Sequence, residues 1–207
     1  MIHLFIAYDD KDKIGDYFTA SQQHLANELQ THCAIQLFDT NAINNGEIEQ
    51  AISALNTKNS NTPFVFVNYS HGKTDSLHTE EKSFVDATNT YYFGKSLFYA
   101  CSCLAGVSLK DSLMENNCTF FIGYNNTITS TYPDWEHLFY ICENTVMLDF
   151  LSKNTPIRNS ITAMYKQYEV FITDDNVDSS TALVLGRNRD CFVYQGNELL
   201  TRNDFVA

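Results

Sequence analysis

Two segments of the chain carry residue types that can do covalent chemistry together. His71 follows the apolar run at 64–69, and Cys101 follows the apolar run at 96–100. A thiol becomes a strong nucleophile only when it loses its proton, and a nearby imidazole can take that proton. Both residues come at the end of a strand-like segment. The pattern therefore predicts a Cys101–His71 pair with His71 as general base.

These strand ends can meet only if the two segments are neighbours in one sheet. The carboxyl ends of adjacent parallel strands lie about 4.8 Å apart at a common rim. Short apolar runs alternate with helix-like segments along the whole chain, an order that indicates a mostly parallel α/β sheet. We expect strands at 2–8, 34–38, 64–69, 96–100, 119–123 and 182–185, with 191–194 as an edge strand or tail. Helices are expected at 18–29, 47–55, 104–115, 135–151 and 157–171, with hairpin strands at 83–85 and 91–93.

The glycine after the histidine has a use of its own. Gly72 has no side chain, so substrate can approach closely and its backbone N–H can point at a developing oxyanion. The N–H of Cys101, close to the start of the following helix, is the second expected donor. Gly72 and Cys101 are thus the predicted oxyanion hole.

Three sequence segments together resemble a known group of enzymes. FVFVNYSHG, SLFYACSCLAG and the later strand TFFIGY are similar to the caspase-like cysteine peptidases, which include caspases, metacaspases, gingipains, separase and the bacterial CHAT peptidases. The match covers roughly residues 2–123 in element order. It implies one domain over residues 1–207, a three-layer sandwich with helices on both faces of a mostly parallel six-stranded sheet. It also implies peptide hydrolysis through a thioester acyl-enzyme, with no cofactor.

The sequence departs from that family pattern around the cysteine. Caspases have Gln-Ala-Cys-x-Gly, whereas this chain has Tyr99-Ala100-Cys101 and its next glycine only at Gly106. The P1 preference is therefore open. Cys103 is the rival nucleophile, and we take Cys101 because Ala-Cys fits the family pattern better. A zinc site using Cys-x-Cys with His71 and His78 is a further alternative, but no second cysteine pair stands at finger-like spacing, so no metal is predicted.

Four more residues are candidates for contact with substrate. Tyr99 precedes the cysteine by two positions, and Asp9, Asp10 and Asp39 follow the first two strands, near the same rim. The simplest explanation of the three aspartates is solvated loop charge and helix capping. The functional alternative is an acidic lining that prefers Lys or Arg at P1.

Charge and cysteine content limit the partners. The formal net charge is -12, which disfavours nucleic acid, and no apolar run is long enough to cross a bilayer. Six cysteines without a secretory signal predict reduced thiols and a cytoplasmic location. The expected partner is a protein substrate, and the CHAT resemblance adds an activating protein or small signalling ligand in bacterial defence or cell death.

Two other functions compete with this one. The opening MIHLFIAYDDKDK also looks like the start of a TIR or other flavodoxin-like signalling domain, some of which cleave NAD. That alternative gives no role to His71 or Cys101. An inactive caspase-like interaction module is the third hypothesis.

Overall fold

The computed structural model describes residues 1–58, 62–130 and 133–206. Its main sheet has six strands in the order β2-β1-β3-β7-β8-β9. The strands are β1 (Ile2–Tyr8), β2 (Cys33–Phe38), β3 (Phe64–Tyr69), β7 (Ser96–Cys101), β8 (Phe120–Tyr124) and β9 (Phe192–Gly196). All pair in parallel except β9, which runs antiparallel along β8. The expected six-stranded, mostly parallel sheet is confirmed.

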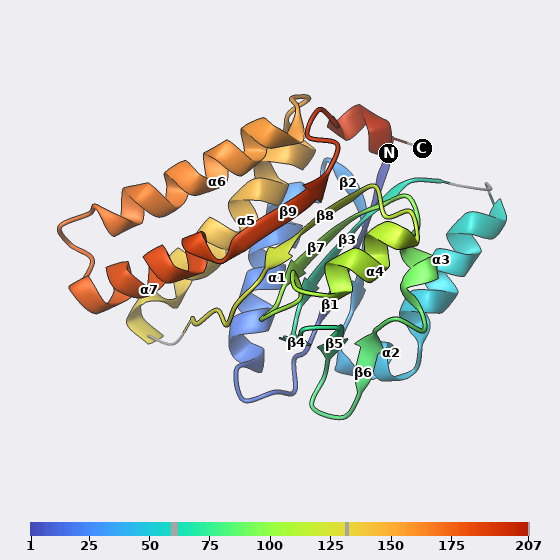
Figure 1. Ribbon diagram of the computed structural model, residues 1–207, viewed down its shortest axis with the longest axis horizontal. Coiled ribbons are helices and arrows are strands. Elements are labelled where there is room, and N and C mark those ends of the chain that lie inside the picture. The colour runs from blue at the N-terminus through green and yellow to red at the C-terminus, as the bar shows by residue number, and fades with distance from the viewer. Residues whose placement is uncertain (59–61, 131–132, 207) are drawn as a thin grey trace.

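Helices cover both faces of this sheet, as Figure 1 shows. One face packs against α1 (Gly15–Leu29), α5 (Glu136–Ser152), α6 (Ile157–Ile172) and α7 (Ser179–Asp190). The other packs against α2 (Thr40–Asn44), α3 (Glu47–Lys58) and α4 (Leu109–Glu115). The central strands β3 and β7 are buried at every position, so they read as continuous apolar runs.

Side-chain alternation along β3 and β7 sends their residues to opposite faces. Val67 and Tyr69 of β3 lie with Tyr99 and Cys101 of β7 in the core beneath α1 and α5. The residues between them lie in the other core. Because a strand has a period of two, residues 71 and 103 are expected on the α1 and α5 side if the strand direction continues. That continuation matters for the site.

A second, three-stranded antiparallel sheet follows His71 directly. It consists of β4 (His71–Lys73), β5 (Ser76–His78) and β6 (Ser83–Val85), in the order β4-β5-β6. A strand was expected at 83–85 and is present. The expected partner at 91–93 is wrong, because the short 3-10 helix η1 (Thr90–Phe93) occupies that position. Hydrogen bonds from the N–H groups of Asn89 and Thr90 to the Asp86 carbonyl turn the chain there.

The strand expected at 182–185 is also wrong. That segment lies inside α7, whose start is fixed by Asp178: its carboxylate accepts the N–H groups of Ser180 and Thr181. Leu185 is buried while Leu183 is 63% exposed, so only one side of the segment meets the core. A short apolar run cannot by itself distinguish helix from strand, and here the cap decides.

The chain ends meet beside the start of β1. Ile2 forms an isolated antiparallel bridge with Val206, which follows the 3-10 helix η3 (Arg202–Phe205). Figure 1 shows the two termini side by side. Within the described ranges, no helix is both long and apolar enough to cross a membrane.

Candidate active site

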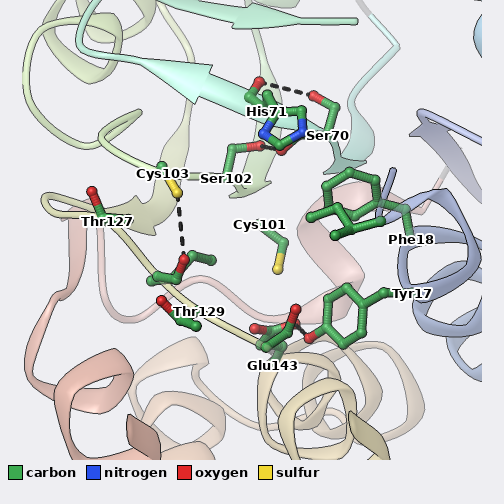
Figure 2. Close-up of a pocket in the computed structure, with 13 residues that line it drawn as sticks. Tyr17, Phe18, Ser70, His71, Cys101, Ser102, Cys103, Thr127, Thr129 and Glu143 are labelled. Carbon is green, nitrogen blue, oxygen red and sulfur yellow. Dashed lines mark hydrogen bonds between the residues drawn. The ribbon is translucent and has the colours of Figure 1, made fainter. Parts of the chain in front are cut away.

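A cavity of about 260 Å³ opens at the carboxyl ends of β3 and β7. Its lining comes from α1, the two strand ends, the loop after β8 and α5 (Figure 2). The lining residues are Ile14, Tyr17, Phe18, Ser70, His71, Cys101, Ser102, Cys103, Thr127, Ile128, Thr129, Ser130 and Glu143. The structure therefore brings His71 and both cysteines of the Cys-x-Cys segment to one cavity.

The register of the sheet sets how His71 and the two cysteines are staggered. Tyr69 of β3 pairs with Cys101 of β7, the last pair in that ladder. Beyond this pair both segments leave the main sheet, and Gly72, which follows His71, packs against the backbone of Cys103. Cys101 lies in the core beneath α1 and α5.

Close backbone packing ties the histidine turn to Cys103. A Cβ atom placed on Gly72 would lie 2.2 Å from the Cys103 carbonyl oxygen and 3.0 Å from Cβ of Ser102. Only glycine allows this approach. Below it, Ser102 Oγ donates to the Ser70 carbonyl at 2.8 Å, and Asn68 Nδ2 donates to Ser102 Oγ at 2.6 Å. The two strand ends are therefore fixed against each other.

His71 has a carboxylate partner that the sequence analysis did not include. Its Nε2 lies 3.0 Å from Oδ1 of Asp12, in the loop after β1. The His71 side chain is 45% exposed, whereas that of Asp12 is only 9% exposed. Donation from Nε2 to Asp12 fixes the tautomer in which Nδ1 carries the free lone pair. His71 is thereby oriented and ready to accept a proton.

Asp12 is itself held in place as an anion. Burial works to raise the pKa of its carboxyl, but the N–H of Ile14, 2.9 Å from Oδ1, and the His71 ring outweigh burial and lower it. The sequence signal was present: Asp12 stands in the acidic run after β1, and β1 is the neighbour of the histidine-bearing strand. Sequence analysis selected Asp9 and Asp10 from that run instead.

The Cys101 thiol is buried at the bottom of the cavity. The residue is only 3% exposed. Burial, followed by the nearby charge of Glu143, raises the pKa of its thiol well above the usual range. A thiolate there would face a carboxylate without solvent, which is unfavourable.

The Cys103 thiol is nearer the mouth of the cavity and half-buried. Its sulfur lies 3.6 Å from the Ile128 carbonyl oxygen, to which the thiol donates. Burial raises its pKa, and contacts with neighbouring backbone groups offset part of that rise. Neither thiol hydrogen-bonds His71 within the described part of the chain, so proton transfer requires one thiol to turn toward the ring.

Backbone amides beside Cys103 are positioned to receive negative charge. The Cys103 N–H has no acceptor among the described residues. Gly72 pairs with Leu77 next to the two-residue turn of β4 and β5, whose closing pair is Lys73 with Ser76. Because hydrogen-bonded and non-hydrogen-bonded pairs alternate, the Gly72 N–H faces away from β5. Cys101, the second oxyanion donor predicted from the sequence, is the last residue of the β7 ladder. The unpaired N–H of Cys103 is better placed than that of Cys101 to receive an oxyanion.

The four predicted substrate contacts lie elsewhere in the structure. Tyr99 is completely buried and donates its hydroxyl to the Glu143 carbonyl at 2.9 Å. Asp9 and Asp10 both accept from Thr40 Oγ1 at 2.7 Å, and Asp39 caps α2 through the N–H of Ala42. None of the four is among the described residues that line the cavity. Capping fits Asp39 and solvated loop charge fits Asp10, whereas Asp9 is fully buried and fits neither explanation.

The acidic floor of the cavity is the other feature that the sequence analysis missed. Glu143 of α5 is 1% exposed and accepts the Tyr17 hydroxyl at 2.6 Å. Burial raises its pKa to about 7, against hydrogen bonds from Tyr17 and Cys101 that lower it. The available signal was a lone acid on an apolar helix face, one turn from Phe139 and from Met147.

The described residues offer no metal site: no three His, Cys, Asp or Glu side chains among them gather as a potential ligand set. The residues at the cavity instead suit acid–base and nucleophilic chemistry.

Comparison with solved structures identifies the architecture. Caspase-1 from Spodoptera frugiperda matches with a TM-score of 0.61 over 97% of this chain and 87% of that chain, at 12% sequence identity. The fold is caspase-like. No protein-family model and no curated protein sequence matches the chain. The likeness therefore concerns the fold alone.

Proposed function

We propose that the chain is a cysteine endopeptidase that hydrolyses protein substrates through a thioester acyl-enzyme. The observation that carries the proposal is one cavity at the strand ends of a caspase-like sheet. This cavity holds His71, which Asp12 orients, together with the Cys103 thiol. A general base, a carboxylate that orients it and a nucleophile are the parts that acyl transfer needs.

We assign the nucleophile to Cys103, the alternative left open by the sequence, rather than to Cys101. His71 takes the proton of Cys103 as the sulfur attacks the peptide carbonyl, and the N–H groups of Gly72 and Cys103 stabilise the oxyanion. His71 then protonates the leaving amine. Water attacks the thioester with His71 again acting as base, which releases the acid and restores the thiol.

Burial supports Cys103 over Cys101. Attack by Cys101 would need a thiolate beside Glu143, on a residue that is only 3% exposed. Attack by Cys103 needs only that its thiol leaves the Ile128 carbonyl, a rotation about one side-chain bond.

The CHAT resemblance extends the proposal to a regulated protease of bacterial defence or cell death, switched on by a partner protein or a small ligand. The chain's six free thiols support a reducing compartment such as the cytoplasm. The signalling alternative gives no use to the His71–Asp12 pair, and the inactive-module alternative differs only in the outcome of an activity test.

A peptide-library cleavage assay on wild type, Cys103→Ala and Cys101→Ala tests the assignment. Cleavage should disappear with Cys103→Ala and persist with Cys101→Ala. The reverse pattern would restore Cys101 as nucleophile. Alkylating the nucleophilic thiol with a peptidyl electrophile and locating the adduct by mass spectrometry answers the same question without turnover. A protein that neither cleaves nor is trapped by any library member would favour the inactive module.

A further inference from the structure

The cavity at the candidate active site ends in an acid that has no basic partner. Glu143 receives a hydrogen bond from the Tyr17 hydroxyl and lies beside the buried Cys101 thiol. No lysine or arginine is among the described lining residues, and no ion pair of the described chain includes Glu143. A buried carboxyl without a cation is unfavourable for folding. Its position at the bottom of an open cavity therefore calls for a functional reason.

The walls above this acid are apolar. Ile14 and Phe18 contribute from the N-terminal end of α1, and Ile128 from the loop after β8. A cavity of about 260 Å³ is slightly smaller than the ~300 Å³ at which drug-sized sites begin, and suits one amino-acid side chain. Apolar walls ending in a carboxylate match a side chain with a hydrocarbon stem and a charged head, which describes lysine and arginine.

The carboxylate also has bonding capacity to spare. An ionised carboxylate offers about four lone-pair sites, and the Tyr17 hydroxyl uses one. The remaining sites can accept two N–H bonds from an ammonium or guanidinium group. The cavity mouth is at His71 and Cys103, so a side chain inserted there would bring its own backbone carbonyl to the nucleophile.

We propose that this cavity is the P1 pocket and that Glu143 makes it select lysine or arginine. The inference rests on the proposed peptidase function and names its substrate class. It places the acidic selectivity on α5 rather than on Asp9, Asp10 and Asp39. Tyr17 acts as a positioning residue, because its hydroxyl donates to the carboxyl and holds it at the bottom of the pocket.

A binding measurement tests the pocket without needing catalysis. Benzamidine is a cationic probe of this size, and benzamide is its neutral counterpart. By calorimetry or NMR titration at pH 8, wild type should bind benzamidine at least about tenfold more tightly than benzamide. Glu143→Gln, which keeps the shape and removes the charge, should abolish that preference, whereas Glu136→Gln on the same helix should retain it. Equal binding of the two probes, no binding, or a preference that survives Glu143→Gln would overturn the inference.

A matched series of fluorogenic peptides that differ only at P1 provides the second measurement. Wild type should cleave after Lys or Arg and discriminate against Gln and Leu, and Glu143→Gln should lose ~100-fold or more in kcat/KM for the basic peptides alone. Cleavage after uncharged residues, together with no benzamidine preference, would sustain the peptidase and overturn this inference. A Glu143-dependent benzamidine preference without any cleavage would sustain the pocket and overturn the peptidase.

Discussion

The rim and the floor of the cavity carry the same residue type in two different chemical settings. Cys103 at the rim is half-buried, and its backbone N–H has no acceptor among the described residues. Cys101, the last residue of β7, is 3% exposed at the floor, where burial and the nearby charge of Glu143 raise the pKa of its thiol. Two positions along the chain thus separate a cysteine suited to be a nucleophile from one suited to structure and selectivity.

Thiol alkylation is the measurement expected to show the largest difference between rim and floor. In the native protein, iodoacetamide should label Cys103 roughly 10²- to 10³-fold faster than Cys101, since Cys101 is reached only through local opening. Peptide mapping by mass spectrometry gives both rates. Cys191 is half-buried like Cys103 but is not among the residues that line the cavity, so it serves as the internal control. Equal rates at Cys101 and Cys103 would break the comparison.

The pH dependence of protein stability should report the titration of Glu143 at the floor of the cavity. Burial raises the pKa of the Glu143 carboxyl from 4.5 to about 7 in the folded state. The folded protein therefore binds this proton more tightly than the unfolded chain. The resulting stabilisation is complete below about pH 4.5 and is lost as the pH rises through about 7, for a total on the order of 3 kcal/mol.

The comparison with Glu143→Gln isolates that effect from other titrating groups. Urea unfolding at pH 5 and pH 8 should show a larger fall in unfolding free energy for wild type than for the variant. Parallel falls in the two proteins would show that Glu143 does not titrate between those values.

Substituting the carboxylate that orients His71 should affect the rim alone. Asp12→Asn is expected to reduce kcat/KM about 10- to 100-fold, because the amide no longer fixes the imidazole tautomer. Its unfolding midpoint should stay close to that of wild type, since the pair is partly exposed. Asp10→Asn is the matched control in the same loop, and a similar loss of activity there would remove the special role of Asp12.

The smallest expected effect is the loss of protein stability when Cys101, at the floor of the cavity, is substituted. Cys101→Ala removes one buried sulfur and should lower the free energy of unfolding by about 1 kcal/mol. Chemical denaturation measures it. A loss of several kcal/mol would mean that the buried Cys101 side chain contributes far more to stability than one sulfur atom usually does.

Local sequence was sufficient to predict the sheet but not the assembly of the cavity. Continuous apolar runs identified β1, β3 and β7 because central parallel strands are buried on both faces. The first helical turn expected after the cysteines is absent: Leu104 has φ of 59°, and the Gly106 N–H bonds to Tyr124 of β8, so α4 begins only at Leu109. This hydrogen bond joins two elements that are separated in sequence, so no local sequence pattern predicts it.

The candidate site shows the same division. His71, Gly72 and the Cys-x-Cys segment were found because strand ends are visible in sequence. Asp12 and Glu143 were missed because their roles depend on contacts across 59 and 42 residues, to His71 and to Cys101. Choosing between the two cysteines required their burial, a property of the folded chain rather than of either strand alone.

The Ile2–Val206 bridge has a consequence for anything attached to the chain. Both ends lie beside the start of β1, whereas the cavity lies beyond the far ends of the strands. Seven residues of β1 separate these positions by roughly 23 Å. A fused tag or domain at either terminus therefore begins on the side of the sheet remote from the cavity. To cover the cavity it would need a linker of at least about seven extended residues.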